Sequence, residues 1–280
     1  MYSCQPAFLT HCLFHLLPDC VRGQGGIDTG KAFRGLAGAA RIAGSHALKK
    51  FLLLGLELVR LARTGQALRR HFDLFANLRP AREGAIDLLV VRENTEGLYS
   101  GRERVTDGGT TAIAERVITA GASERIVRAA CEQARQRRGK LALVHKANVL
   151  KETCGLFRQV GLAVIGEYPD LEVEELLVDT AALKLAQDPG RFDVIVTTNL
   201  FGDILSDLCA GLVGGLGLAP GANIGADAAI FEAVHGTAPD IAGQGKANPC
   251  ALLLGAAQML DHLDMGDKAT RLRQAIVETL

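Results

Sequence analysis

From Gly84 onward, short apolar runs alternate with segments in which apolar residues recur at helical spacing. The runs are IDLLVV, LALVH, LEVEELLV and FDVIVTT. This alternation is typical of βα units and predicts an α/β fold with a largely parallel sheet. Ligands of such sheets bind outside the carboxyl ends of the strands, so we expect functional residues directly after the runs. Asp179, Asn199 and the pair His145 and Lys146 stand at such positions.

Two local signals set boundaries along the chain. We expect Ser123 to cap a helix that ends near Gly139. The segment 211–225 contains six glycines and Pro220, a composition that predicts a loop or a crossing between domains and not the interior of an element.

Charge and cysteine content narrow the class of protein. The 280 residues carry 31 basic and 31 acidic side chains, so the chain lacks the electrostatic signature of a nucleic-acid-binding protein. The seven cysteines are scattered without metal-binding spacing, which is typical of reduced thiols in a cytoplasmic protein. The apolar stretch Ala7–Leu17 is too short to span a bilayer, so we expect no membrane partner. The scarcity of acidic residues before Arg60 leaves the mitochondrial matrix as an alternative location.

Two carboxylates are placed one helical turn apart after the last apolar run. Asp203 and Asp207 are spaced i and i+4, so they project from the same helix face and repel each other. A cation would compensate this repulsion, and we therefore predict a divalent-metal site. Asp179, which closes another apolar run, is the third candidate ligand.

Three arginines are candidates for binding an anionic substrate. Arg69, Arg79 and Arg92 lie on segments that the βα pattern brings toward one cleft, and guanidinium groups suit bidentate capture of carboxylates. Together they indicate a small polycarboxylate. The alternative for each arginine taken alone is a salt bridge with a surface acid.

Tyr99 and Lys146 are the candidate proton-transfer groups. A metal and other cations lower the pKa of a nearby lysine, which makes it usable as a base, and a tyrosine can return a proton to a carbanion. The alternative for Lys146 is a solvated surface group. Asn148 can follow Lys146 around a turn.

The segment FEAVHGTAPDIAGQGKAN has the features of a nucleotide-binding loop. Small residues such as Gly236 and Ala238 let the backbone approach a ligand, and His235 offers a stacking face. Asp240 can accept hydrogen bonds from a ribose diol and would repel a 2′-phosphate, so we expect NAD and not NADP. The alternative is an ordinary glycine-rich surface loop.

Six segments together resemble the β-decarboxylating dehydrogenases, which act on isocitrate, homoisocitrate or 3-isopropylmalate. They are LRRHFDLFANLRP, VVRENTEGLYSG, VHKANVLK, VDTAALKL, TTNLFGDILSDL and VHGTAPDIAGQGKANP, in family order between Ala67 and Leu263. The resemblance implies the isopropylmalate-dehydrogenase-like two-domain fold. That fold binds NAD without a Rossmann fingerprint, so the absence of GxGxxG is no objection.

The resemblance also implies a role for each candidate residue. Arg69, Arg79 and Arg92 would hold substrate carboxylates with Asn148 nearby, Tyr99 would be the acid and Lys146 the base. Mg²⁺ or Mn²⁺ would bind Asp203 and Asp207 of one subunit and Asp179 of the other, in a homodimer with shared active sites. The residues that match NAD-binding positions are Glu232, His235, Gly236, Ala238, Asp240 and Asn248.

The motifs favour one substrate within the family. RENTEG and HGTAPDIAG resemble NAD-dependent isocitrate dehydrogenase more than isopropylmalate enzymes. Arg63 and Gly65 stand where isocitrate enzymes usually have Ser and Asn, and Gln66 stands where homoisocitrate enzymes have Arg. Homoisocitrate or 3-isopropylmalate dehydrogenase therefore remains an alternative, as does a non-catalytic accessory subunit.

The resemblance divides the chain into three parts. Residues 75–213 are expected to form the small domain, which carries dimerisation and catalysis, and residues 214–280 the NAD-binding part of a truncated large domain. Residues 1–74 are expected to comprise an atypical N-terminal part, where the family's first strand and turn are missing, and the start of the large domain. We expect Met1–Arg60 to pack poorly and NAD binding to be weak.

Overall fold

The computed structural model describes residues 65–236 and 238–279, which fall into two units. Helix α3 (Gly65–His71) belongs to the first unit, and everything from Phe72 onward belongs to the second. The expectation for Met1–Arg60 lies outside the described residues, as do Arg63 and Thr237.

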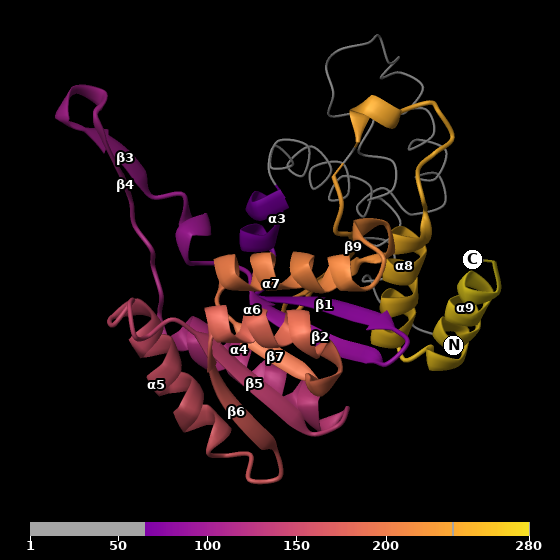
Figure 1. Cartoon of the computed structure of the whole chain (residues 1–280), viewed down its shortest axis with the longest axis horizontal. Coiled ribbons are helices and arrows are strands. Elements are labelled where there is room, and N and C mark those ends of the chain that lie inside the picture. Colours follow the sequence, from indigo (N-terminus) through magenta and orange to yellow (C-terminus); the bar gives the residue numbers. More distant parts are fainter. Residues whose placement is uncertain (1–64, 237, 280) are drawn as a thin grey trace, which may run out of the picture. The chain divides into compact units, whose positions relative to one another are not determined.

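A seven-stranded sheet forms the centre of the second unit (Figure 1). Its strands, in spatial order, are β6 (Glu172–Leu177), β5 (Lys140–His145), β7 (Val194–Thr197), β2 (Ile86–Glu93), β1 (Ala76–Glu83), β8 (Pro220–Ile224) and β9 (Ala229–Ala233). β6, β5, β7 and β2 pair in parallel, whereas β1 is antiparallel to β2 and β8, and β9 to β8. Five of the seven strands thus run in one direction, and the predicted α/β fold with a mostly parallel sheet is confirmed.

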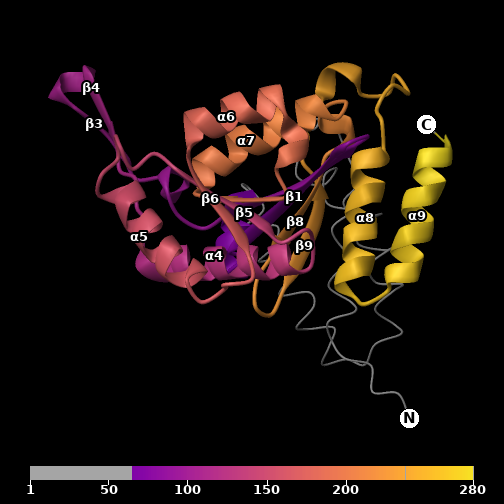
Figure 2. The same cartoon turned by 60° about the horizontal axis from the view of Figure 1, so that its bottom comes forward.

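Helices cover both faces of β5, β7 and β2, which explains why these strands are largely apolar, whereas the edge strand β6 carries three glutamates and is mostly exposed. Figure 2 shows α4 (Ala120–Arg135) and α5 (Thr153–Ile165) on one face and α6 (Val178–Gln187) and α7 (Asn199–Leu212) on the other. Alternate residues of β5, β7 and β2 therefore enter two separate cores. The first contains Val91, Leu143, Val196, Ile126 and Phe157, and the second contains Val90, Val144, Ile195, Leu185 and Leu205.

The predicted cap of α4 is wrong by one turn. The helix begins at Ala120, and its cap is Thr119, whose hydroxyl accepts from the Ala122 amide at 3.3 Å. The buried carboxylate of Glu96 accepts from the amide and the hydroxyl of Thr119 at 3.0 and 2.9 Å. This contact between distant segments selects Thr119, while Ser123 turns its hydroxyl back to the Thr119 carbonyl at 2.7 Å.

The prediction of a loop over residues 211–225 is wrong for its second half. α7 continues to Leu212, and Pro220–Ile224 forms β8, a mostly buried strand between β1 and β9. Small residues suit this position because a side chain at Gly221 would begin 3.3 Å from Val234 Cγ2.

Strand β1 was not predicted, because its sequence ANLRPARE mixes charges with a proline. β8 pairs only with residues 76–78 of β1, and Pro80 lies beyond that pairing, so its missing N–H is tolerated. Asn77 and Arg79 alternate with Ala76 and Leu78 along the strand, and Ala76 enters the first core. The alternation turns Asn77 and Arg79 toward α7.

The remaining elements are a hairpin, two helices and several short turns. β3 (Glu103–Thr106) and β4 (Thr111–Ala114) form a separate sheet that projects from the body, and α8 (Cys250–His262) packs against α9 (Gly266–Thr279) (Figures 1 and 2). The 3-10 turns are η3 (Leu98–Ser100), η4 (Asp107–Gly109), η5 (Pro189–Arg191), η6 (Leu216–Leu218) and η7 (Pro239–Ile241). None of the described helices is long and apolar enough to cross a membrane.

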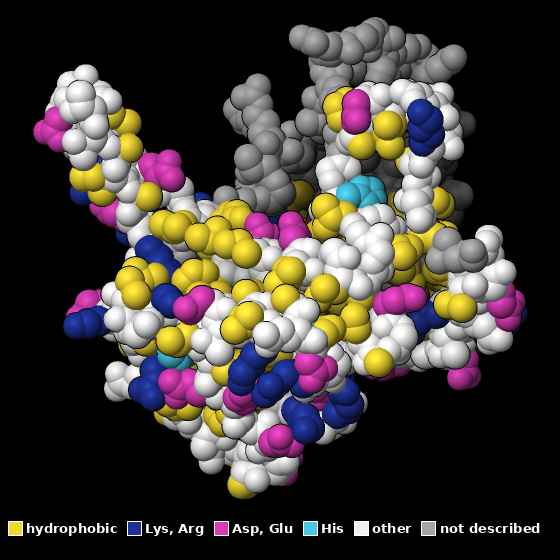
Figure 3. Space-filling view, viewed as in Figure 1, with side chains coloured by type: hydrophobic (Ala, Val, Ile, Leu, Met, Phe, Trp, Pro, Cys, Tyr) yellow, Lys and Arg dark blue, Asp and Glu magenta, His cyan; other side chains and the backbone are white. Residues whose placement is uncertain are grey.

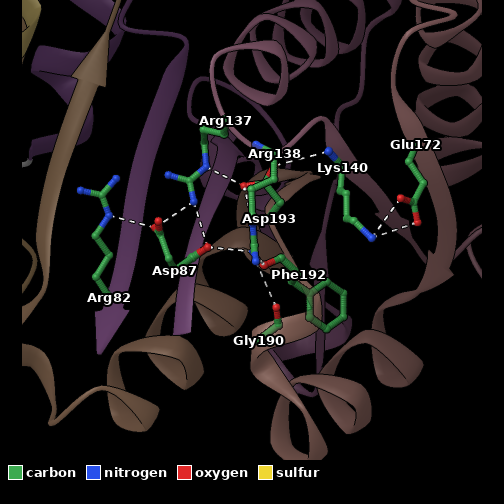
Figure 4. Close-up of polar contacts among 9 residues, drawn as sticks. All are labelled: Arg82, Asp87, Arg137, Arg138, Lys140, Glu172, Gly190, Phe192 and Asp193. Atoms are coloured by element: carbon green, nitrogen blue, oxygen red, sulfur yellow. Dashed lines mark hydrogen bonds and ion pairs between the residues drawn. The ribbon is translucent and has the colours of Figure 1, made fainter. Parts of the chain in front are cut away.

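An ion-pair cluster closes the edge of the sheet where the parallel strands begin (Figure 4). The Asp193 side chain, which is fully buried, accepts from Arg137 Nε and from the Arg138 amide, both at 2.8 Å. Arg137 also donates to Asp87 Oδ1 at 2.9 Å, and Arg82 donates to the same oxygen at 2.9 Å. The cluster ties the turn after α4 to the starts of β2 and β7.

Candidate active site

The two carboxylates of α7 meet two of the predicted arginines. Arg79 Nη1 lies 3.4 Å from Asp207 Oδ1, and Arg79 Nη2 lies 3.7 Å from Asp203 Oδ1. Arg92 Nη1 donates to the same Asp203 oxygen. The repulsion between Asp203 and Asp207 is thus compensated by guanidinium groups from β1 and β2.

α7 approaches β2 closely because residue 202 is glycine. A Cβ at Gly202 would lie 2.6 Å from both Cβ and Cγ of Arg92, and Arg92 is only 1% exposed. The first residue of α7 fixes the same arginine, since Asn199 Oδ1 accepts from Arg92 Nε at 2.9 Å. Asn199 in turn donates to the Glu96 carbonyl at 3.0 Å.

Tyr99 points at the same carboxylate. It lies in η3, its hydroxyl donates to Asp203 Oδ2 at 2.5 Å, and the Arg92 guanidinium lies 5.0 Å from its ring centre. Burial raises the pKa of Tyr99, and the hydrogen bond to Asp203 and the charge of that carboxylate raise it further. The phenol is therefore neutral near pH 7 and has a proton to give.

Lys146 and Asp179 form a second, separate pair. Lys146 follows the last residue of β5, and its ammonium donates to Asp179 Oδ1 at 2.6 Å. Asp179 lies in the first turn of α6, where the hydrogen bond from Lys146 and then backbone N–H groups lower its pKa. Asn148 is exposed in the turn after Lys146, and its predicted part in substrate binding stays a prediction.

Sequence reasoning did not predict the contacts that hold these groups in place. The ring of His145, 2% exposed, bonds Glu175 through Nε2 and accepts the Ala147 amide at Nδ1, both at 3.1 Å, which fixes the turn that carries Lys146. The positions of Asn199 and His145 at the carboxyl ends of strands could be predicted from the sequence, but their hydrogen-bond partners could not. Nothing in the sequence indicated Ser206, which accepts from Arg79 Nη1 at 3.2 Å.

The carboxylates fit a divalent metal in chemical type. Asp203 and Asp207 offer hard oxygen donors of the kind that Mg²⁺ and Mn²⁺ prefer, and each carboxylate oxygen has two lone pairs, so its hydrogen bonds do not exhaust it. Among the described residues of one chain, no three His, Cys, Asp or Glu side chains could together hold a metal. Asp179, with its bond to Lys146, is therefore not the third ligand within a single chain.

The predicted cofactor residues lie along one segment that runs from β9 to the start of α8 and is largely exposed after the strand. Glu232 is on β9, where its carboxylate accepts from Asn223 at 2.8 Å. His235 and Gly236 follow in an exposed turn, Ala238 has a left-handed backbone with φ 40°, and Asp240 is exposed in η7. Asn248 Oδ1 accepts from the Cys250 amide at 2.9 Å at the start of α8.

Arg69 lies on α3, in the first unit, so its predicted part in the site stays a prediction. The structure brings together Arg79, Arg92, Tyr99, Asp203 and Asp207 at the carboxyl ends of β2 and β7. Guanidinium groups, paired carboxylates and a neutral phenol at this edge define a site suited to a small anionic molecule.

Comparison with known proteins identifies the family. Residues 57–280 match the model of the isocitrate/isopropylmalate dehydrogenase family, and the chain belongs to this family. It is 53% identical over 222 residues to a 3-isopropylmalate dehydrogenase of Archaeoglobus fulgidus, covering 76% of this chain and 68% of the relative. It is 54% identical over 218 residues to an isocitrate/homoisocitrate dehydrogenase of Thermus thermophilus, covering 75% of this chain and 64% of the relative.

A further relative and a solved structure are consistent with this family assignment. A probable mitochondrial NAD isocitrate dehydrogenase alpha subunit of Drosophila melanogaster is 46% identical over 224 residues, covering 76% of this chain and 59% of the relative. The crystal structure of an isocitrate dehydrogenase from Methylococcus capsulatus superposes with a TM-score of 0.74 at 49% identity, covering 77% of this chain and 68% of the other. The chain is thus a member of this dehydrogenase family, and it spans about two thirds of the length of the relatives it matches.

Proposed function

We propose that the chain catalyses NAD-dependent oxidative decarboxylation of a 2-hydroxy acid with Mg²⁺ or Mn²⁺, and that the acid is isocitrate, which yields 2-oxoglutarate. One observation carries the proposal: Arg92 and Tyr99 converge on the two oxygens of Asp203. A cation that binds carboxylates, a proton donor and a metal ligand are thereby held within one cluster.

The chain's own residues would divide the work as follows. Arg79 and Arg92 bind and orient the substrate carboxylates, Lys146 removes the hydroxyl proton, and Tyr99 protonates the carbanion left by decarboxylation. Asp203 and Asp207 would hold the metal, which when bound supplies stabilisation of negative charge on the substrate oxygens. Arg69 and Asn148 would complete the substrate contacts.

The loop from Glu232 to Asn248 would hold NAD, the hydride acceptor. Its exposed backbone at His235, Gly236 and Ala238 is open to a ligand, and the exposed Asp240 is open to a ribose diol. In this proposal residues 75–213 are the small catalytic domain and residues 214–280 belong to the cofactor-binding domain.

A second copy of the chain would complete the site. Lys146 and Asp179 bond to each other and not to the cluster on α7, as expected if both reach the site of a partner. Leu183 on α6 and Ile204 on α7 are each 57% exposed, and Figure 3 shows hydrophobic side chains gathered over these helices. An apolar face beside the carboxylates supports pairing through α6 and α7.

The choice of isocitrate rests on the motifs RENTEG and HGTAPDIAG. Relatives named for 3-isopropylmalate, homoisocitrate and isocitrate all match at 46 to 54% identity, so identity favours none of them. A cytoplasmic location, with the mitochondrial matrix as alternative, is part of the same proposal.

The test is NADH formation with isocitrate, homoisocitrate and 3-isopropylmalate, each with Mg²⁺ and with a chelator in its place. We expect turnover that requires the metal and prefers isocitrate. Preference for 3-isopropylmalate would overturn the choice of substrate. Absence of turnover with all three acids, together with stimulation of a separate catalytic subunit, would instead establish an accessory role.

A further inference from the structure

A row of polar side chains crosses the sheet beneath α7. The strand register places Arg92 opposite Asn77, and Asn77 opposite Asn223. Asn77 is fully buried and Asn223 is 1% exposed. Side chains directly opposite on neighbouring strands project from the same face, so these three lie side by side.

The asparagines link two parts of the candidate site in one chain of hydrogen bonds. Asn223 Nδ2 donates to Glu232 Oε1 at 2.8 Å, and Asn223 Oδ1 accepts from Asn77 Nδ2 at 2.8 Å. Asn77 Oδ1 accepts from Arg79 Nε at 2.7 Å, and Arg79 continues to Asp207 at 3.4 Å. The path therefore runs from β9, where the cofactor segment begins, to the carboxylates of α7.

The partners fix the orientation of each amide. Asn223 Nδ2 faces a carboxylate and Asn223 Oδ1 faces two amide donors, Asn77 and Asn94, so rotating this amide would place oxygen against oxygen. The same rotation at Asn77 would set its NH₂ group against the Arg79 guanidinium. The partners therefore allow one orientation for each of the two amides.

Packing alone does not require these amides. Apolar side chains fill the equivalent interior of the parallel strands, and a buried amide without a partner costs about 1–3 kcal/mol. Asn94 is a side branch of the network: its Nδ2 donates to Asn223 at 3.0 Å and to the Leu74 carbonyl at 2.9 Å. Its Oδ1 is buried without a hydrogen-bond partner among the described residues, whereas both amide ends of Asn77 and Asn223 are bonded.

We propose that Asn77 and Asn223 are positioning residues that couple the cofactor segment to the substrate-binding arginine. The inference rests on the proposed function: a nucleotide that engages Glu232 and its neighbours sets Asn223, then Asn77, and so the direction of the Arg79 guanidinium toward substrate and α7. Binding of the acid and binding of the nucleotide then favour each other through this path.

The test measures that coupling directly. The Kd of NADH is determined by its fluorescence, with and without Mg²⁺ plus isocitrate, in the full chain and in Asn77→Ala and Asn223→Ala. NADH and isocitrate cannot react with each other. The Kd without isocitrate divided by the Kd with Mg²⁺ plus isocitrate therefore reports coupling alone. We expect the ratio to fall by about 2-fold to 30-fold in both variants.

Asn94→Ala is the matched control, because Asn94 is equally buried and bonded to Asn223 but lies off the path. It is expected to lose thermal stability while keeping the ratio of the wild-type chain. If Asn223→Ala does not fold, Asn77→Ala applies the same test to the neighbouring bond.

The outcomes separate the two proposals. A wild-type chain that forms NADH from isocitrate but whose variants keep its ratio overturns the coupling and leaves the proposed function intact. An equal loss of the ratio in Asn94→Ala also overturns it, since the network is then a general support. A wild-type chain that binds no NADH and shows no turnover contradicts the proposed function, and the coupling with it.

Discussion

Replacing Gly202 by alanine tests how closely α7 must approach Arg92. The new Cβ would lie 2.6 Å from two side-chain atoms of Arg92 and 3.2 Å from its Cα, whereas ordinary contacts begin near 3.4 Å. Arg92 is buried at 1% exposure and cannot swing away, so α7 must move by about 1 Å. Such overpacking costs about 1–3 kcal/mol.

Gly211→Ala on the same helix is the matched control. A Cβ at Gly211 meets nothing within 4 Å, so this change gives only a gain in helix propensity, which is at most about 1 kcal/mol near the end of a helix. Both variants receive that gain, so the difference between their free energies of unfolding isolates the overpacking cost. We expect Gly202→Ala to be less stable than Gly211→Ala by about 1–3 kcal/mol in urea unfolding.

We expect turnover to fall in Gly202→Ala and to stay unchanged in Gly211→Ala. Displacement of Asp203 by about 1 Å from Arg92 and Tyr99 is expected to lower kcat by about 100-fold, while Gly211→Ala keeps the wild-type rate. Equal unfolding free energies of the two variants would refute the steric argument. A destabilised Gly202→Ala with unchanged kcat would show that the cluster is not the site of reaction.

Three further changes probe other parts of the chain. Asp193→Ala removes the acid partner of Arg137 from a buried pair and should cost about 3–5 kcal/mol in urea unfolding, whereas Asp170→Ala at an exposed pair with Arg135 should change little. Tyr99 should ionise above pH 10.0, seen as the tyrosinate absorbance lost in Tyr99→Phe, and Asp203→Asn should lower its pKa toward that value. Because the folded chain holds this proton more tightly than the unfolded one, the corresponding stability is present below pH 10.0 and lost as pH rises through the raised pKa. Asp240→Lys should shift the NAD to NADP ratio of kcat/KM by about 1.4-fold to fivefold, since an exposed charge contributes about 0.2–1 kcal/mol, and an unchanged ratio would place the ribose elsewhere.

The fold could be predicted wherever one pattern determined the element. IDLLVV, LALVH and FDVIVTT correspond to β2, β5 and β7, because strands buried on both faces require continuous apolar runs. LEVEELLV corresponds to β6, an edge strand whose glutamates are exposed or half-buried. β1 and β8 were missed since a proline and glycines mask them, and only their place between other strands makes these residues suitable. The α4 cap was misplaced because Glu96, remote in sequence, holds Thr119.

The candidate site could likewise be predicted only in part. The spacing of Asp203 and Asp207 predicted a shared helix face and a need for positive charge, which Arg79 and Arg92 meet in the structure. The asparagines that link Arg79 to Glu232 could not be predicted, because they come from three strands and their roles depend on register. Pairing between strands is a property of the fold, and local sequence does not encode it.

The central claim is that the cluster on α7 is half of an active site whose other half, Lys146 and Asp179, comes from a second copy. The most direct test mixes two variants, Lys146→Met and Asp203→Asn, each expected to be inactive alone, after unfolding and refolding them together. In a mixed dimer one site receives Lys146 from one chain and Asp203 from the other and is intact, while the second site lacks both. With half of the dimers mixed and one of two sites intact, NADH formation should return to about a quarter of the wild-type rate. A mixture that stays inactive, although native mass spectrometry shows mixed dimers, would contradict the shared site.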